Sequence, residues 1–551
     1  MYRTARLVLI AAALLLVGVA GGSAASPTPS PTRQDVAKRI LDSAAGQTMT
    51  APARAYMESV ARGDQRLAPD SNAVSSSQRS VKVNAAKATG GPGLTNVRVN
   101  NPALDTHQTD QTTQSETSVA VSGQNVAVGY NSSQHGLLIL TAGGNLTGYG
   151  YSTDGGRTFT DGGVLPNAPG QVNVGDPWLA SDSNGTMYYS TLSIRPATGD
   201  LLVAVSHSTN GGKTWSAAAP IPPPPGQFFY SADKDALTTG PGAGNLYDGW
   251  DDFTFDPATG TPFSGLPVAH STDGGQTWTL TYASKVALLN PAKGCSFSQY
   301  IGARPLVAGR ILYDGAELIS VNDPNCTGAP LTFSEAVFTS RDGGTTWAAG
   351  AVIPITSSTP HASQAFQLST GQLMRNIEFP TLAAFQGKVY VAWNDGGDGS
   401  GHSHIRLAQL DESGQATKVS FITSGTNDEV QPALSADSDL HIAYYQISTD
   451  ASGNGQLDVF VSNSNNGNNN NGNSNNGNGF TSQRVTSQSF PGVFNLPQFD
   501  PLIAPVYMGD YIANVSDGDH QYIAWGDNRD IVTNFLWPGG RHDPDVFFAR
   551  Q

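Results

Sequence analysis

The sequence predicts an all-β fold made of repeated antiparallel sheets, and three observations lead to that prediction. An eight-residue turn phrase occurs four times along the 551 residues, and a strand opening of a different form recurs seven times. The composition agrees with both, because 62 Gly, 34 Pro and only 13% charged residues are typical of a turn-rich, extended chain rather than a helical one.

Each copy of the turn phrase has the residue types of a tight hairpin turn. The copies are STDGGRTF at 152–159, STNGGKTW at 208–215, STDGGQTW at 271–278 and SRDGGTTW at 340–347. The third residue has a short acceptor side chain that can bind backbone N–H groups further along the turn, and Gly-Gly supplies the positive φ. Apolar alternation precedes the turn and an aromatic residue follows it. The phrase therefore predicts a turn joining two antiparallel strands.

The four phrases resemble the Asp-box of the sialidase-like superfamily of β-propellers. In that family the box lies on the outer hairpin of a blade, away from the mouth where ligands bind. The resemblance therefore implies a structural role for the acceptor residue of each phrase, and says little about activity. These residues are Asp154, Asn210, Asp273 and Asp342.

The strand openings predict how many blades the ring contains. They are ETSVAV (from 116), DPWLAS (176), DKDALTT (233), ARPLVA (303), EFPTLAA (378), QPALSA (431) and GDYIAN (509), each followed by a second strand. Seven such pairs predict a β-propeller of seven four-stranded blades, with six blades as the alternative. Residues 96–100 precede the first blade and 545–550 end the last, so we expect these two strands to pair and close the ring.

The N-terminal residues predict secretion, and secretion in turn sets the expectation for the two cysteines. Residues 1–25 have the arginines, apolar run and small residues of a signal peptide, and the run is too short for a membrane span. In an oxidising compartment we expect Cys295 and Cys326 to form a disulfide, two free thiols being the alternative. Residues 26–94 predict a flexible or partly helical segment and 95–551 the propeller, with a disordered Asn/Gly insertion at 463–479.

The charge balance limits the partners of the protein. A formal net charge of −15 disfavours nucleic acid and anionic membrane surfaces, because both would be repelled. We expect a monomer that binds an extracellular glycan or polysaccharide.

The predicted ligand site lies at one mouth of the ring. The start of the first strand and the end of the second strand of each blade share one face, because antiparallel strands reverse direction once between them. Carboxylates and indoles at these positions are typical of sites for neutral sugars. The candidate ligand-binding residues are Glu116, Asp176, Trp250, Arg304, Trp393, Asp395, Asp510, Trp525, Asp527 and Arg529.

Two kinds of chemistry are possible for the acids at this mouth. A glycoside hydrolase needs one protonated and one ionised carboxyl group, and Asp233 and Glu378, which open different blades, are the candidate pair. Ca²⁺ also takes oxygen ligands, and Asp235, Asp251 and Asp252 are the candidate ligands. The alternatives are that such acids accept backbone N–H bonds and that the tryptophans pack between blades.

The sequence departs from the sialidases within that superfamily. The first opening lacks an arginine, the Arg-Ile-Pro motif is absent, and only Arg304 and Arg529 match in strand position. An acidic rim would also repel an anionic sugar, so no sialidase catalytic residue is transferred. The sequence thus predicts a secreted propeller that recognises a glycan at its mouth, with hydrolysis of that glycan as a further possibility. A non-catalytic adhesion or protein-interaction propeller is the alternative, and an exo-sialidase the second alternative.

Overall fold

The computed structural model describes twelve stretches of the chain and a few short segments elsewhere, including 81–83 and 365–367. The stretches are 94–105, 113–135, 144–226, 230–256, 262–288, 296–325, 329–356, 373–378, 380–464, 479–492, 508–533 and 538–551. The predicted signal peptide, both cysteines, most of 26–94 and most of the Asn/Gly insertion lie outside the described residues.

Strands that neighbour one another in sequence pair antiparallel and form four-stranded sheets. The first sheet has the order β6-β5-β4-β3, and β1 adds to its outer edge. Its strands are β3 (Gln114–Ser122), β4 (Asn125–His135), β5 (Asn145–Ser152), β6 (Phe159–Val164) and β1 (Val81–Val83).

The next two units are joined into one nine-stranded sheet by a single parallel contact, in which Leu201 pairs with Ser231. One unit has β7 (Val172–Asn173), β8 (Trp178–Ser181), β9 (Met187–Arg195), β10 (Asp200–Ser208) and β11 (Ala219–Pro220). The other has β12 (Tyr230–Thr239), β13 (Leu246–Phe255), β14 (Pro262–Ser271) and β15 (Thr279–Ala287).

Three further sheets repeat the same up-and-down pattern. The first of them has β16 (Phe297–Ile301), β17 (Leu306–Ala308), β18 (Ile311–Val321), β19 (Thr332–Ser340) and β20 (Ala348–Ile355). After the short pair β21 (Ala365–Gln367) and β22 (Leu373–Arg375) come β23 (Thr381–Phe385), β24 (Lys388–Asp395), β25 (His404–Leu410) and β26 (Ala416–Phe421). The third has β27 (Asp428–Ala436), β28 (Leu440–Thr449), β29 (Gly455–Ser464), β30 (Phe480–Arg484) and β31 (Phe490–Pro491).

The last sheet combines the C-terminal strands with a strand from near the beginning of the described chain. It has the order β2-β34-β33-β32, with β32 (Ala513–Ser516), β33 (Gln521–Val532), β34 (Arg541–Arg550) and β2 (Val97–Arg98). Val97 pairs with Phe548 and Arg98 with Phe547, so the strand before the first sheet joins the final strand, as the sequence predicts. A short 3₁₀ helix, η2 (Pro102–Leu104), then leads toward β3.

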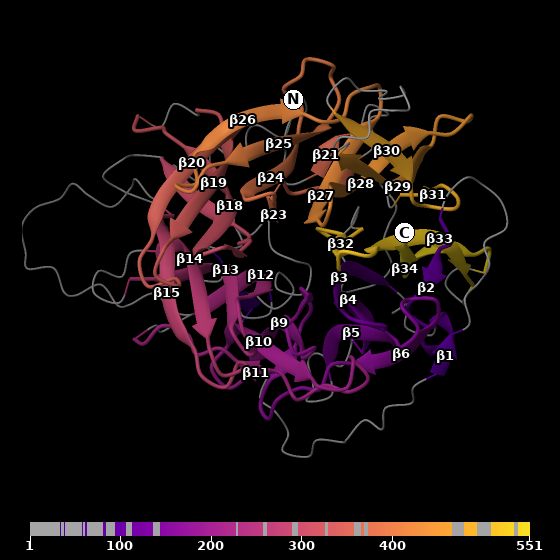
Figure 1. Ribbon diagram of the computed structural model, residues 1–551, viewed down its shortest axis with the longest axis horizontal. Helices are drawn as coiled ribbons and strands as arrows, with labels where there is room; N and C mark the ends of the chain where they lie inside the picture. The colour runs from indigo at the N-terminus through magenta and orange to yellow at the C-terminus, as the bar shows by residue number, and fades with distance from the viewer. Residues whose placement is uncertain are drawn as a thin grey trace, which may run out of the picture.

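The sheets follow one another around a common centre (Figure 1). The hydrophobic core lies between successive sheets, because each sheet buries both of its faces against its neighbours. One cluster, for example, combines Val119 and Phe159 of the first sheet with Ala524 and Phe548 of the last. The rings of Phe159 and Phe548 meet edge to face at 4.9 Å. The chain is therefore an all-β protein of antiparallel, four-stranded sheets, and the last sheet packs against the first.

The four turn phrases form hairpin turns that hydrogen-bond to themselves. In the first, Asp154 Oδ1 accepts from the backbone N–H groups of Arg157 (3.0 Å) and Thr158 (2.9 Å). Gly155 and Gly156 follow with φ of 73° and 81°. Asp273 and Asp342 repeat these bonds, and the Asn210 side chain accepts from Thr214 N at 3.1 Å. A short side-chain acceptor therefore stabilises each turn from within.

Candidate functional site

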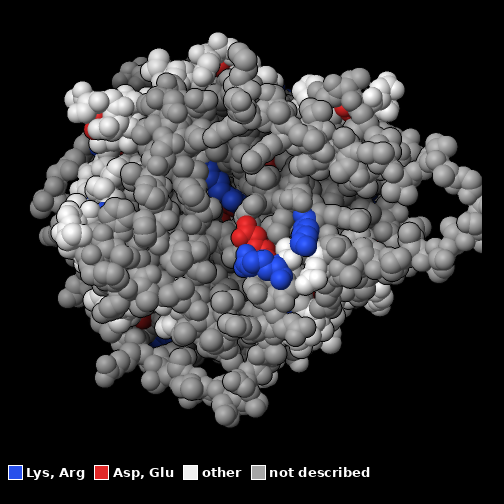
Figure 2. Space-filling view, turned by 180° about the vertical axis from the view of Figure 1, so that it is seen from behind, with Lys and Arg blue, Asp and Glu red and all other residues white. Residues whose placement is uncertain are grey.

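A cavity of ≈ 580 Å³ runs along the centre of the ring. Its walls are the first strands of successive sheets, and residues of β3, β8, β12, β17, β23, β27 and β32 all line it. Arg304, Ile377, Asp510 and Tyr511 line it where these strands begin. Viewed from behind Figure 1, Lys or Arg atoms and Asp or Glu atoms lie side by side near the centre (Figure 2). The volume lies within the range of small-ligand sites.

Four of the strand openings hold a polar residue in a strained backbone conformation. The φ angles are 52° at Glu116, 54° at Asp176, 52° at Lys234 and 53° at Gln431. In β3, β12 and β27 the residue lies within a shift of strand register, which is the mark of a β-bulge. Positive φ costs free energy for residues other than glycine, and such strain concentrates at functional sites. Functional residues are therefore expected at these strand openings.

Two cations hold the carboxylate of Asp510 at this end of the ring. Lys234 Nζ lies 2.8 Å from Asp510 Oδ2, and Arg375 binds both carboxylate oxygens at 2.6 and 2.8 Å. All three side chains are almost completely buried. Although burial opposes ionisation, the charges of Arg375 and Lys234 hold the pKa of Asp510 below its ordinary value. Asp510 is therefore a fixed negative charge.

A chain of hydrogen bonds connects this ion pair to the neighbouring openings. Glu116 Oε1 accepts from the backbone N–H of Asp510 at 3.0 Å, and Glu116 Oε2 accepts from Asn131 Nδ2 at 2.7 Å. Asn131 Oδ1 in turn accepts from the backbone N–H of Asp176 at 2.9 Å. Asn131 thus fixes the position of two openings, on β3 and before β8, relative to each other.

The carboxyl group of Asp176 is the exception within this network. Its side chain is fully buried, and neither oxygen has a hydrogen-bond partner among the described residues. Burial, and then the nearby charge of Glu116, raise the pKa of Asp176 well above its ordinary value. Buried polar groups without partners are rare in folded proteins, so Asp176 is a candidate proton donor.

Asp233 and Asp235 lie on either side of Lys234 and face different surroundings. Asp233 Oδ1 accepts from the backbone N–H of Lys234 at 3.1 Å, and burial raises the pKa of Asp233 in spite of the positive charge of Lys234. Burial and the neighbouring Asp248 raise the pKa of Asp235. Asp248 itself accepts from Ser190 Oγ at 2.6 Å, and burial raises its pKa to about 7. This end of the ring therefore holds several carboxyl groups with raised pKa values around Asp510, whose pKa is lowered.

The structure does not bring the predicted catalytic pair together in one described contact. Asp233 has Lys234, Asp510 and Arg375 as its charged neighbours. Glu378 instead lies near Glu335, whose pKa is raised by burial and by neighbouring carboxylates that include Glu378. The described charged neighbours of Asp233 and Glu378 therefore differ, and their role as a catalytic pair stays a prediction.

The predicted Ca²⁺ ligands do not converge on one point. Asp251 and Asp252 are consecutive in β13, so their side chains leave opposite faces of the sheet. Asp251 Oδ1 accepts from the backbone N–H of Gly302 at 2.7 Å, whereas Asp252 Oδ2 accepts from Tyr282 Oη at 2.5 Å. Across the part of the chain that the structure describes, no group of three His, Cys, Asp or Glu side chains is arranged to hold a metal ion.

The structure corrects the expectation that indoles line the mouth. Trp250, Trp393 and Trp525 are at most 1% exposed and belong to the hydrophobic core between sheets. Their indole N–H groups bind Tyr230 Oη, Asp395 Oδ2 and Asp527 Oδ2, respectively. Packing between sheets, the alternative considered for the sequence, is therefore the arrangement found. No indole face of these three residues is available to a sugar.

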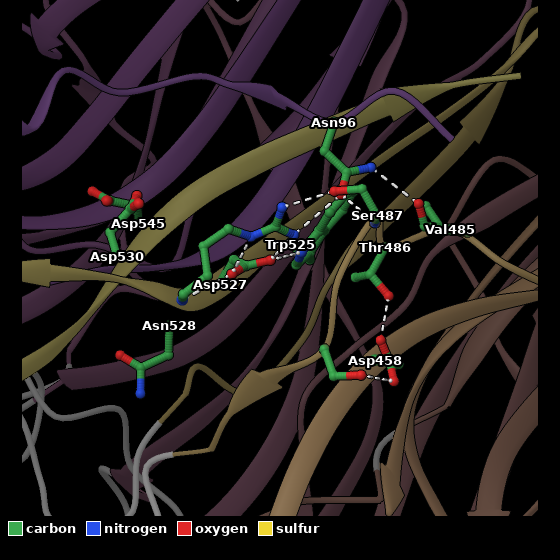
Figure 3. Close-up of polar contacts among 12 residues, drawn as sticks. Asn96, Asp458, Val485, Thr486, Ser487, Trp525, Asp527, Asn528, Asp530 and Asp545 are labelled. Carbon is green, nitrogen blue, oxygen red and sulfur yellow. Dashed lines mark hydrogen bonds and ion pairs between the residues drawn. The ribbon is translucent and has the colours of Figure 1, made fainter. Parts of the chain in front are cut away.

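Asp395, Asp527 and Arg529 also bind protein groups instead of facing the cavity. Asp395 Oδ2 accepts from Arg406 Nη1 at 2.7 Å. Arg529 binds both oxygens of Asp527 at 2.8 and 2.5 Å, and its guanidinium also donates to Ser487 and Asn96 (Figure 3). Because these bonds link β33 to the segments around β2 and β30, they stabilise the junction of two sheets.

Arg304 is positioned by aromatic side chains that the sequence analysis did not single out. Its guanidinium lies 4.4 Å from the Trp178 ring and 5.7 Å from the Tyr511 ring, and its side chain is almost completely buried. Tyr511 Oη donates to the carbonyl of Pro177 at 3.0 Å. Trp178, Lys234 and Tyr511 lie within or next to the strand openings, so comparing equivalent positions of the openings would have found them.

Comparison with known proteins supports the nature of the turn motif. Residues 269–280 match the model of the BNR/Asp-box repeat, and they contain the third turn phrase. No curated protein matches the chain. The chain carries this repeat and is similar in structure to known arabinanases and sialidases.

Three solved structures illustrate that similarity. The α-L-arabinofuranosidase of Fusarium graminearum is 12% identical with a TM-score of 0.37, covering 70% of this chain and 96% of that one. The α-L-arabinanase of Penicillium chrysogenum, solved with arabinobiose, is 14% identical with a TM-score of 0.38, covering 69% and 95%. The Trypanosoma rangeli sialidase, solved with sialic acid, is 14% identical with a TM-score of 0.38, covering 70% and 59%. Similarity at this level assigns neither an activity nor a substrate to the chain.

Proposed function

We propose that this protein is a secreted, seven-bladed β-propeller that recognises an extracellular glycan and hydrolyses it. The glycan would bind at the end of the central cavity where the strand openings lie. The pairing of β2 with β34 and the repeated four-stranded units support the seven-bladed ring. Secretion is proposed from the leader-like residues 1–25. No helix within the described residues is long and apolar enough to cross a membrane.

One observation carries the enzymatic part of the proposal: carboxyl groups whose pKa values are shifted in opposite directions lie in one buried network. Burial raises the pKa of Asp176 well above its ordinary value, whereas Arg375 and Lys234 hold the pKa of Asp510 below its ordinary value. Glycoside hydrolysis needs this division, because one carboxyl group protonates the leaving oxygen while a negative charge stabilises the oxocarbenium-like transition state. In this proposal Asp176 donates the proton, while Asp510, whose charge Arg375 and Lys234 more than offset, holds the strand openings in place. Asp233 and Glu378 stay candidates for the group that activates water.

A specific observation also favours a non-catalytic binding propeller as the second candidate. Glu116, Asp233 and Asp510 all accept hydrogen bonds from backbone or side-chain donors of the protein itself. Acids that are bound in this way can simply hold the openings together. The two candidates differ at Asp176, because a purely structural network gives its unpartnered carboxyl group no role.

The experiment is a glycan array together with a glycosidase screen, using the full chain and two variants. Asp176→Asn removes the proton donor while keeping shape, and Asp458→Asn is the control because Asp458 of β29 binds Arg484 of the paired strand β30 at 2.5 Å and does not line the cavity. We expect the wild type and the control to bind and hydrolyse a neutral oligosaccharide, and Asp176→Asn to bind without hydrolysis. Binding by all three without hydrolysis would favour the non-catalytic propeller. Release of sialic acid from a fluorogenic substrate would instead indicate the exo-sialidase.

A further inference from the structure

Acidic side chains gather beside the pairing that closes the ring. Asp545 of β34 is 1% exposed, and the carboxyl group of Asp530 on β33 lies next to it (Figure 3). Asp543 of the same strand and Asp105, just after η2, are also buried. We call these four aspartates the acidic seam. They lie where β2, the strand that joins the beginning of the ring to its end, has only two residue pairs with β34.

Side chains of β2 and the residues after it are held to β34 through the acidic seam. The guanidinium of Arg98 contacts Asp530, and its Nε lies 3.8 Å from Asp545 Oδ2. Asn100 Nδ2 donates to Asp545 Oδ1 at 2.6 Å, while Asn100 Oδ1 accepts from the backbone N–H of Val546 at 2.9 Å. The protonation state of Asp545 therefore affects the contacts that hold the ring closed.

Asp105 extends the seam toward the first sheet. Its Oδ1 accepts from Gln114 Nε2 at 3.0 Å and from Gln134 Nε2 at 2.9 Å. Its Oδ2 is buried with no hydrogen-bond partner among the described residues. Gln114 Oε1 in turn accepts from Asn100 at 3.0 Å. One network thus connects Asp105, through Gln114 and Asn100, to Asp545.

Negative groups outnumber positive ones around the seam. The charged or titratable side chains that face it are Arg98, Arg541, Asp161 and Tyr130, in addition to the four aspartates. Arg541 is bound to Asp543 at 2.8 Å, and Arg529 is bound to Asp527 instead of to the seam. Two cations face five carboxyl groups, so complete ionisation would leave buried negative charge without compensation.

We propose that the acidic seam is a proton-dependent closure of the ring, tight when Asp105 and Asp545 retain protons and loosened when they ionise. The titration behaviour agrees with the geometry. Burial raises the pKa of Asp105 to about 8, and burial together with the contact to Asp530 raises the pKa of Asp545 well above its ordinary value. A carboxyl group with a raised pKa stabilises the folded state at low pH. For Asp105 that contribution is lost as the pH rises from about 4 toward about 8. The closure therefore favours acidic surroundings.

The test is hydrogen exchange of backbone amides in the full chain at pH 5 and pH 8. Exchange of the amides of β34 that face β2 is compared with exchange of β28 amides in the same sample, after correction for intrinsic rates. Each carboxyl group that retains a proton in the closed form changes the equilibrium between closed and locally opened β34 by up to about tenfold per pH unit. We therefore expect the protection of β34 relative to β28 to be at least about tenfold lower at pH 8 than at pH 5.

Two variants make the result specific to the seam. Asp545→Asn keeps an oxygen for Asn100 but cannot ionise, and Asp105→Asn tests the same network if the first variant does not fold. We expect each variant to lose a clear share of the pH response, whereas Asp458→Asn keeps it. Equal relative protection of wild-type β34 at both pH values would overturn the proposal. A pH response in both seam variants as large as in the wild type would also overturn it. Neither outcome depends on whether the protein binds a glycan.

Discussion

Arg375 holds Asp510 through two parallel hydrogen bonds, from Nε to Oδ1 at 2.6 Å and from Nη2 to Oδ2 at 2.8 Å. The two residues are 135 positions apart in the chain and both are buried. Lys234 binds the same carboxylate from a third part of the ring. The ion pair therefore connects segments that lie far apart in the sequence. It also sets the charge at the end of the cavity that Asp510 lines.

Replacing Arg375 by alanine should destabilise the protein by at least about 1.5 kcal/mol, because Asp510 loses two charge-assisted hydrogen bonds in a buried site. Urea unfolding measures this change. Arg341→Ala is the control, since Arg341 forms an exposed ion pair with Glu412 at 3.4 Å and should cost less than about 1 kcal/mol. Equal losses in the two variants would contradict the role given to the buried pair.

Stability should fall as the pH rises through neutrality, opposite to the behaviour of most carboxylates. Burial raises the pKa of Asp248 to about 7, so its contribution is complete below about pH 4 and lost as the pH rises through 7. Asp248→Asn keeps an acceptor for Ser190 but cannot ionise. Between pH 5 and pH 8 we expect its unfolding free energy to drop by about 2–3 kcal/mol less than that of the wild type, measured by urea unfolding at both values.

The turn phrases offer a built-in comparison between aspartate and asparagine. Asn210 already replaces the aspartate in the second copy, where its Oδ1 accepts from Thr214 N and its Nδ2 donates to Thr214 Oγ1 at 2.8 Å. Asp273→Asn should therefore leave the melting temperature almost unchanged, whereas Asp273→Ala should lower it by removing the acceptor for Thr277 N. Differential scanning fluorimetry distinguishes the two, and an equal loss in both would show that the charge matters more than the hydrogen bonds.

Closure of the ring depends on Phe548 as much as on the strand pairing. Its ring is fully buried, contacts Phe159 and lies where a Cβ on Gly156 would approach its Cε1 to 2.3 Å. Phe548→Ala should cost about 3–5 kcal/mol, and Gly156→Ala should also destabilise, since its φ is 81°. Phe460→Ala, on a partly buried ring at another sheet, should cost clearly less. Chemical denaturation of the three variants tests this order.

Much of the fold could be predicted because its signals are local. The acceptor side chain and the two glycines of a turn phrase, such as Asp154 with Gly155 and Gly156, hydrogen-bond or bend within one turn, so the sequence contains all the information needed. The pairing of 96–100 with 545–550 followed from counting strands, and Val97 indeed pairs with Phe548. Local sequence patterns do not reveal in which direction the side chains at the ends of strands point.

The site was harder to predict for that reason. Lys234 was missed because the opening was aligned from Asp233, and a β-bulge shifts which residue of β12 takes the strained position. The indole of Trp393 was placed at the mouth, but packing against the adjacent sheet buries it completely. Asp176 was named as a ligand-binding residue, whereas its raised pKa depends on burial, which no residue spacing reveals.

The most direct test of the central claim is a crystal structure of the protein soaked with the oligosaccharide that the glycan screen selects. We predict a sugar bound at the end of the cavity where Arg304, Asp510 and Tyr511 lie. A sugar bound only on the outer hairpins near the turn phrases, with the cavity unoccupied, would contradict it.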